Sequence, residues 1–219
     1  TVTPSSTAVA TLARPVLRVL WKCTLRCWPV PAAAMASRAT ASRARTSVGT
    51  ATPIESAMAW VEAGKPADPT AFHTATRDDV ATQLGSDVAF VTPTGTTQCM
   101  TDEKADGALA CLVDLRHPPT EPSDAYGHWI GGWADFDGST LSVGSTHADP
   151  GRFAAGKGAE LPYGTSLRFG DFQCRSDADG LFCVNFAHQS GVKFADSGVE
   201  PLGCLKMVDA PDLGLKFSC

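Results

Sequence analysis

The spacing of apolar residues changes along the chain and predicts two kinds of secondary structure. After Pro53 the apolar positions recur every three or four residues, at Ile54, Ala57, Met58 and Val61. That period places them on one face of a helix, and Gly64 is a typical residue after a helix end. The pattern predicts a short amphipathic helix. A weaker pattern over residues 69–85 predicts a second short helix, or partly a loop.

From residue 86 the apolar positions occur in short runs that are rich in β-branched and aromatic residues. Gly, Pro, Asp and Asn separate these runs, as expected for strands joined by turns. The predicted strands are Val88–Thr92, Thr97–Thr101, Ala108–Leu115, Trp129–Phe136, Leu141–His147, Ser166–Arg175, Leu181–Ala187 and Val192–Ala195. Short strands at this spacing favour an antiparallel sheet. The predicted fold class is mainly β, a small antiparallel β-sandwich or barrel with one or two short N-terminal helices.

The charge of the chain is divided between two unlike segments. The 219 residues include 18 basic and 23 acidic residues, for a net charge of −5. Seven basic residues and no acidic ones lie in residues 1–54, which leaves 11 basic and 23 acidic residues, a net charge of −12, in residues 55–219. Because phosphate contacts require cations, nucleic-acid binding by residues 55–219 is not expected. The hydrophobic content of 43% excludes a wholly disordered chain.

Residues 1–54 form a basic low-complexity leader in which Ala, Ser and Thr dominate. Such a composition is typical of a disordered basic arm that contacts anionic lipid or nucleic acid. It is equally typical of a GC-rich gene read in the wrong frame. The most apolar stretch is broken by Arg14, Pro15 and Arg18, so the pattern predicts neither a transmembrane helix nor an intact signal peptide.

Composition thus divides the chain into three parts. The leader at 1–54 is followed by a short helical segment at 55–85 and by a β domain at 86–219. Cys23 and Cys27 of the leader have no predicted role. We expect any membrane association to depend on a native N-terminus that this sequence lacks.

Two of the six cysteines in the β domain predict a disulfide from hairpin register. The residues on either side of Ala178 and Asp179 read as two strands joined by a tight turn. In a symmetric hairpin centred there, Cys174 lies directly opposite Cys183. Directly opposed Cβ atoms are about 4.5–5.5 Å apart, near the distance that a disulfide spans.

The remaining cysteines of the β domain follow the same reasoning. A hairpin centred on Ala105 places Cys99 opposite Cys111, and Cys204 and Cys219 then close a C-terminal loop. Six cysteines allow many connectivities, so this pairing is an inference from register. Reduced thiols or metal ligands are the alternative, although the chain contains no Cys-x-x-Cys. Three disulfides predict a β domain stapled by these bonds in an oxidising, extracytoplasmic compartment.

Several short motifs in the β domain resemble those of a known protein family. Phe90 to Gly95, with Cys99, resembles the F-x-[ST]-P-[ST]-G-x(3)-C opening of a family of actinobacterial, mycobacterial-type exported or lipoprotein-like domains of unknown function. Later parts resemble its L-x-Y-G, G-x-F-x-C and G-[VL]-x-C-x-N motifs, at 161–164, 170–174 and 180–185. The resemblance covers residues 86–204, and the chain departs from it at 190–194. It implies an envelope location, a membrane segment or signal ahead of the domain, and no catalytic residue.

An aromatic, glycine-rich segment is the preferred binding surface. Its candidate residues are Tyr126, His128, Trp129 and Trp133. Aromatic side chains beside glycines can form a platform for a sugar or a lipid chain. The two tryptophans are four residues apart on a predicted strand and should share a face. The alternative interpretation is that they belong to the ordinary core.

A second set of polar residues is consistent with metal or acid–base chemistry. Its members are His128, His147, Asp135, Asp137 and Asp149. Imidazole and carboxylate groups together bind divalent metal ions or transfer protons. The alternative is that they lie at exposed hairpin ends, because Asp-Gly and Asp-Pro are turn signals. The Gly-x(4)-Gly-Lys motif at 151–157 and the Asp-x-Asp-Gly motif at 177–180 are interpreted as a surface loop and a hairpin turn.

The sequence therefore predicts an exported cell-envelope protein without identifying its activity. The leading hypothesis is non-enzymatic binding of another envelope protein, a glycan or a lipid, without a cofactor. The alternative is a metal-assisted hydrolase that uses His128, His147 and the nearby aspartates.

Overall fold

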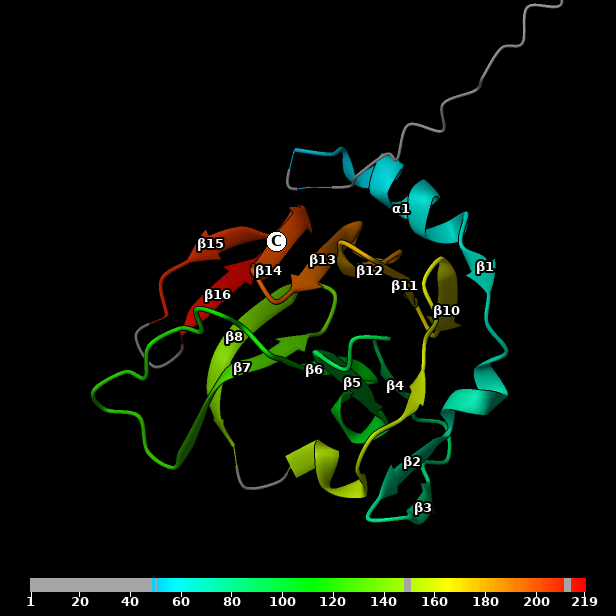
Figure 1. Ribbon diagram of the computed structural model, residues 1–219. Coiled ribbons are helices and arrows are strands. Elements are labelled where there is room, and N and C mark those ends of the chain that lie inside the picture. The colour runs from blue at the N-terminus through cyan, green and yellow to red at the C-terminus, as the bar shows by residue number, and fades with distance from the viewer. Residues whose placement is uncertain (1–48, 50, 148–150, 211–213) are drawn as a thin grey trace, which may run out of the picture. The chain divides into compact units, whose positions relative to one another are not determined.

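A computed structural model shows two large β-sheets, a small hairpin and a helix (Figure 1). It describes residues 49, 51–147, 151–210 and 214–219. The predictions for Cys23, Cys27, Asp149 and most of the leader fall outside the described residues. The helix and the sheets are parts of one structural unit.

The first sheet has six strands, most of which follow one another in the chain. In spatial order they are β1 (Lys65–Pro66), β10 (Thr165–Phe169), β11 (Phe172–Asp177), β12 (Gly180–Asn185), β13 (Ser190–Ala195) and β14 (Gly198–Gly203). All neighbours are antiparallel except β1 and β10. Tight turns between consecutive strands therefore alternate between the two ends of this sheet.

The second sheet has eight strands. In spatial order they are β15 (Lys206–Val208), β16 (Leu215–Ser218), β8 (Thr140–His147), β7 (His128–Phe136), β6 (Ala108–Val113), β5 (Thr97–Asp102), β4 (Ala89–Val91) and β9 (Ala159–Glu160). Only the β4–β9 pair is parallel. A separate hairpin consists of β2 (Thr74–Arg77) and β3 (Val80–Gln83).

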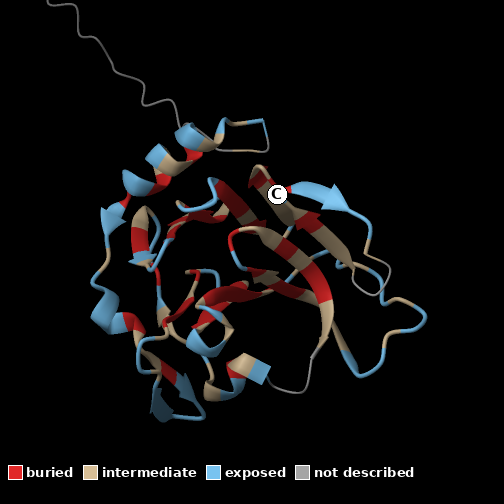
Figure 2. Ribbon diagram, turned by 180° about the vertical axis from the view of Figure 1, so that it is seen from behind, coloured by how far each residue is buried: buried red, intermediate tan, exposed pale blue. Residues whose placement is uncertain are grey.

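The two large sheets share one apolar core. The second sheet contributes, among others, Phe90, Leu109, Phe136 and Val143, and the first contributes Leu167, Phe172, Leu181, Val192 and Phe194. Figure 2 shows the buried residues concentrated along these strands. No closed barrel forms among the described strands. The predicted mainly β fold is confirmed, and of the two predicted arrangements it is the sandwich.

The first predicted helix is confirmed as α1 (Ile54–Glu62), which covers the outer face of the six-stranded sheet. Ala57 and Val61 are buried against side chains of β12 and β14. Arg175 of β11 donates from Nη1 to the Trp60 carbonyl oxygen at 2.5 Å, and its guanidinium carbon lies 3.9 Å from the centroid of the Trp60 ring. No helix in the described part of the chain is long and apolar enough to cross a membrane.

The outer face of the eight-stranded sheet is covered by other segments. These are the hairpin β2–β3 and the 3₁₀ helix η3 (Gly151–Ala155). Phe153 of η3 meets Trp133 of β7 edge to face, with the ring centroids 5.1 Å apart. Ala75 of β2 is buried in the same cluster. The predicted surface loop at 151–157 therefore contributes a buried aromatic ring to the packing.

The three predicted disulfides are confirmed as Cys99–Cys111, Cys174–Cys183 and Cys204–Cys219. The first two join residues that lie directly opposite each other in a hairpin, with Cα atoms 4.1 and 4.0 Å apart. Their four cysteines are buried in the core between the sheets. The third joins the residue after β14 to the residue after β16, and so links the two sheets. Three disulfides indicate an oxidising environment outside the cytoplasm.

The second helix predicted at 69–85 does not form. A short 3₁₀ helix, η1 (Pro69–Phe72), leads into the hairpin β2–β3. Its turn residues Asp78 and Asp79 have φ angles of 48° and 65°. Two consecutive residues with positive φ give a turn whose twist matches that of the strands. The turn chemistry of the Asp-Asp pair outweighed the weak helical spacing.

The strand predictions differ from the structure in two further respects. The single strand predicted at Ser166–Arg175 is wrong, because a tight turn at Gly170 and Asp171 divides it into β10 and β11. Gly170 has a φ of 50°, which favours glycine there. Besides β2 and β3, the five strands β1, β9, β14, β15 and β16 lie outside the predicted ones. The edge strand β14 contains Pro201, and proline is tolerated at a sheet edge where its position needs no N–H to pair with a neighbouring strand.

Candidate functional site

Of the residues in the predicted aromatic surface, Trp133 belongs to the core. Trp133 is 2% exposed, packs on Phe153 and donates its indole N–H to Asp135 Oδ2 at 2.9 Å. Trp129 is half-buried, and its indole N–H donates to the Pro119 carbonyl oxygen at 3.3 Å. The alternative interpretation of Trp133 as a core residue is therefore correct.

A β-bulge lies between the two tryptophans. The pairing of β7 with β8 shifts register between Ile130 and Ala134. Within the bulge, a Cβ added to Gly132 would lie 2.1 Å from the Val113 carbonyl oxygen, so only glycine fits this approach. Four steps along β7 oppose two along β8, so the bulge adds two residues and leaves the alternation of faces unchanged. Tyr126, before the bulge, is 96% exposed.

The residues predicted for metal or acid–base chemistry are spread along the β7–β8 hairpin. His128 is exposed and pairs with His147 at the open end, whereas Asp135 and Asp137 lie at the turn. At about 3.3 Å per residue, the two ends are roughly 20 Å apart. Asp149 lies outside the described residues. Among the residues that the structure describes, no three His, Cys, Asp or Glu side chains are close enough to hold a metal ion.

A cavity of about 610 Å³ lies where loops of both sheets meet at one end of the sandwich. These loops join β3 to β4, β5 to β6, β7 to β8, β10 to β11 and β12 to β13. We call this cavity the acidic cleft, and its titratable residues are Asp87, Glu103, Asp106, Asp137, Asp171 and His188. Its volume falls within the range of about 300–1,000 Å³ that is common for ligand sites. None of the described residues that line it is Lys or Arg.

Local hydrogen bonds orient the carboxylates beside β5. Asp87 Oδ1 accepts from the Thr101 hydroxyl and from the backbone N–H of Glu103, each at 2.8 Å. Glu103 Oε2 accepts from the Ser86 hydroxyl at 2.6 Å. A carboxylate can accept about four hydrogen bonds, so both groups keep free acceptor positions. These bonds fix the side chains without neutralising their charge.

Asp137 organises the β7–β8 turn. Its Oδ1 accepts from the backbone N–H and the hydroxyl of Ser139 and from the backbone N–H of Thr140, at 2.7, 2.9 and 2.6 Å. Its Oδ2 accepts from the Thr140 hydroxyl at 2.6 Å. Burial raises the pKa of Asp137, but the hydrogen bonds from Thr140 and Ser139 outweigh it and hold the pKa below its ordinary value. Asp137 is therefore a stable negative charge at neutral pH.

The floor of the acidic cleft is aromatic. The rings of Phe169 and Phe172 stack with centroids 5.8 Å apart and an interplanar angle of 18°. Phe172 also meets Phe136 edge to face at 5.5 Å, which holds its ring in place. None of the ion pairs found between described residues uses a carboxylate of the cleft. The site therefore combines uncompensated negative charge with aromatic faces, which attract cations.

Sequence reasoning singled out only Asp137 from this cleft. Acidic residues do stand beside glycine at three of its turns, at 106–107, 137–138 and 170–171. These pairs are turn signals. Only the order of strands in the two sheets shows that these turns lie at one end of the sandwich.

No protein-family model, no curated protein and no solved structure matches this chain. The resemblance to exported actinobacterial domains therefore stays a prediction. The geometry of the described residues is the basis for assigning a function.

Proposed function

We propose that the protein is an exported cell-envelope domain that binds a basic segment of a partner protein, without catalysis, in the acidic cleft. The observation that supports this most is the cavity of about 610 Å³ with five carboxylates, an aromatic floor and no lining cation. Ammonium and guanidinium groups pair with carboxylates, while their aliphatic stems cover apolar surface.

The arrangement of charge supports a peptide with several cations. The five carboxylates come from four loops around the cavity, with Glu103 and Asp106 on the same one. Carboxylates at a distance from one another can each pair with a different Lys or Arg side chain of a peptide. A single small cation could not contact all of them at once. The net charge of −12 for residues 55–219 also attracts a basic partner over distance.

Binding of a fluorescent Lys/Arg-rich peptide, followed by anisotropy, tests this proposal. Each exposed charge pair contributes about 0.5–1 kcal/mol, so Asp106→Asn with Asp171→Asn should weaken binding about five- to thirty-fold. Raising the salt concentration from about 0.1 M to about 1 M should weaken it further, since the screening length falls from roughly 10 Å to 3 Å.

A matched control removes the same amount of charge elsewhere. Asp177→Asn with Asp179→Asn neutralises two carboxylates on the β11–β12 turn, at the opposite end of the sandwich. This variant should bind the peptide nearly as well as the unmodified protein. Equal weakening by both double variants would show that only net charge matters, and an absence of binding at low salt would contradict the proposal outright.

A further inference from the structure

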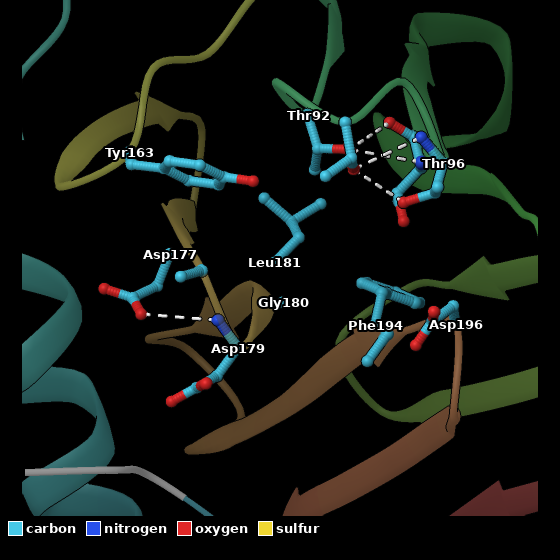
Figure 3. Close-up of a pocket in the computed structure, with 13 residues that line it drawn as sticks. Thr92, Thr96, Tyr163, Asp177, Asp179, Gly180, Leu181, Phe194 and Asp196 are labelled. Atoms are coloured by element: carbon cyan, nitrogen blue, oxygen red, sulfur yellow. Dashed lines mark hydrogen bonds between the residues drawn. The ribbon is translucent and has the colours of Figure 1, made fainter.

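A second pocket lies at the end of the sandwich opposite the acidic cleft (Figure 3). Strand β11 connects the two sites, because it begins at the cleft with Phe172 and ends at this pocket with Asp177. We call it the threonine pocket, and its polar side chains are those of Thr92, Thr94, Thr96, Thr97, Tyr163, Asp177, Asp179 and Asp196. Its volume of about 130 Å³ corresponds to roughly four water molecules.

Three segments that carry the motifs described in the sequence analysis meet in this pocket. They are the Thr-Pro-Thr-Gly turn at 92–95, the segment at 161–164 and the strand that begins at Gly180. Tyr163 is 47% exposed, so its ring contributes little to the core. Figure 3 shows its hydroxyl pointing into the pocket toward Leu181 and the Thr92 side. An exposed tyrosine directed into a pocket is suited to contacting a ligand.

One wall of the pocket is a row of hydroxyl groups. Thr94 Oγ1 lies 2.7 Å from Thr96 Oγ1 and 3.3 Å from Thr92 Oγ1, and either member of each pair can donate. Thr92 Oγ1 also accepts from the backbone N–H of Thr97 at 3.2 Å. A hydroxyl carries one donor and two acceptor positions. The row can therefore reorient to donate to a ligand oxygen or to accept from a ligand hydroxyl.

The facing wall carries acceptors. Asp177 Oδ1 accepts only a long bond, at 3.4 Å, from the backbone N–H of Asp179. The third carboxylate, Asp196, forms an ion pair of 2.6 Å with Arg116, which offsets its charge. The floor between the walls is apolar and consists of Leu181 and Phe194.

We infer that the threonine pocket binds one terminal residue of a neutral glycan, a function separate from the acidic cleft. A sugar ring presents hydroxyls that both donate and accept, which matches a hydroxyl row facing carboxylates. Its C–H face matches the Tyr163 ring and the apolar floor. An anion would be repelled by Asp177 and Asp179, and a simple cation offers no acceptor to the hydroxyl row. The volume admits the end of one ring and leaves no room for a second.

Titration of the full-length oxidised protein with methyl glycosides of glucose, galactose and mannose, followed by amide NMR shifts, tests this inference. At least one glycoside should shift the signals of residues 92–97 and 177–181 with a dissociation constant on the order of millimolar. Tyr163→Ala should weaken that binding about five-fold or more, and Tyr163→Phe about three-fold, since it keeps the ring and removes the hydroxyl. Both variants change an exposed side chain and should keep the native spectrum.

Two further probes separate this inference from its alternatives. Asp106→Asn, in the acidic cleft, should leave glycoside binding unchanged. Peptide binding in the cleft and glycan binding in the threonine pocket can therefore fail independently of each other. Methylammonium chloride serves as the cationic probe and should not produce the same shifts. Shifts with methylammonium in place of the glycosides, glycoside binding that is unaltered in Tyr163→Ala, or no shift with any glycoside would each overturn the inference.

Discussion

The disulfide between Cys204 and Cys219 differs from the other two in its exposure. Cys219 is exposed and Cys204 half-buried, whereas the cysteines of the two hairpin disulfides are all 0% exposed. Thiol–disulfide exchange requires that the attacking thiolate reach a sulfur atom. A mild reductant should therefore open Cys204–Cys219 first, while the buried disulfides stay closed until the sandwich unfolds.

The size of the effect follows from the loop that this disulfide closes. Its sequence separation is 15 residues, and a loop of that length restricts the unfolded chain by roughly 3 kcal/mol. For a domain of this size each kcal/mol shifts the Tm by about 2–4 °C, so the paired variant Cys204→Ser/Cys219→Ser should lose about 6–12 °C. The domain should still fold, because β16 keeps its ladder with β8.

Two measurements check this reasoning together. Alkylation after brief reduction, read by peptide mass spectrometry, should label Cys204 and Cys219 well before the buried cysteines. Thermal unfolding of the paired variant should show the lowered Tm with an unchanged native spectrum. Labelling of Cys174 or Cys183 at the same rate, or a Tm within about 2 °C of the unmodified protein, would refute the account of this disulfide.

Three further predictions concern single residues. Trp133→Ala should lower the free energy of unfolding by about 3–5 kcal/mol, measured in urea, whereas Tyr126→Ala at an exposed site should change it by less than about 0.5 kcal/mol. Because the pKa of Asp137 is lowered on folding, its stabilisation is complete above the ordinary value of 3.8 and is lost as the pH falls through the folded pKa. Urea unfolding of Asp137→Asn should thus show a smaller loss of stability under acid than the unmodified protein, and an equal loss would contradict this. Gly132→Ala should cost about 1–3 kcal/mol, since its Cβ would meet the Val113 oxygen, and an unchanged Tm would contradict the described bulge.

Local rules were sufficient to predict part of this fold. The turn at Ala178 and Asp179 sets the register of one hairpin, and that register alone places Cys174 opposite Cys183. The helix at Ile54–Glu62 was predictable because its apolar period is clear and its buried face is narrow. In each case the decisive residues lie within a few positions of one another.

Other features depended on contacts between distant segments. Trp133 is buried because Phe153 of η3 packs on its ring, and no pattern within β7 shows that contact. The acidic cleft joins residues as far apart as Asp87 and His188, and only the order of the strands brings them together. Sequence patterns do show each turn, but they do not show which turns share an end of the sandwich.

We propose that the acidic cleft binds a cationic peptide. Titration of the isotope-labelled protein with a Lys/Arg-rich peptide, followed by amide NMR shifts, tests it most directly. We predict that the shifts concentrate on residues 101–107, 137–140, 169–172 and 185–188, and that salt reverses them. Shifts confined to the opposite end of the sandwich, or spread evenly over the acidic surface, would contradict the claim.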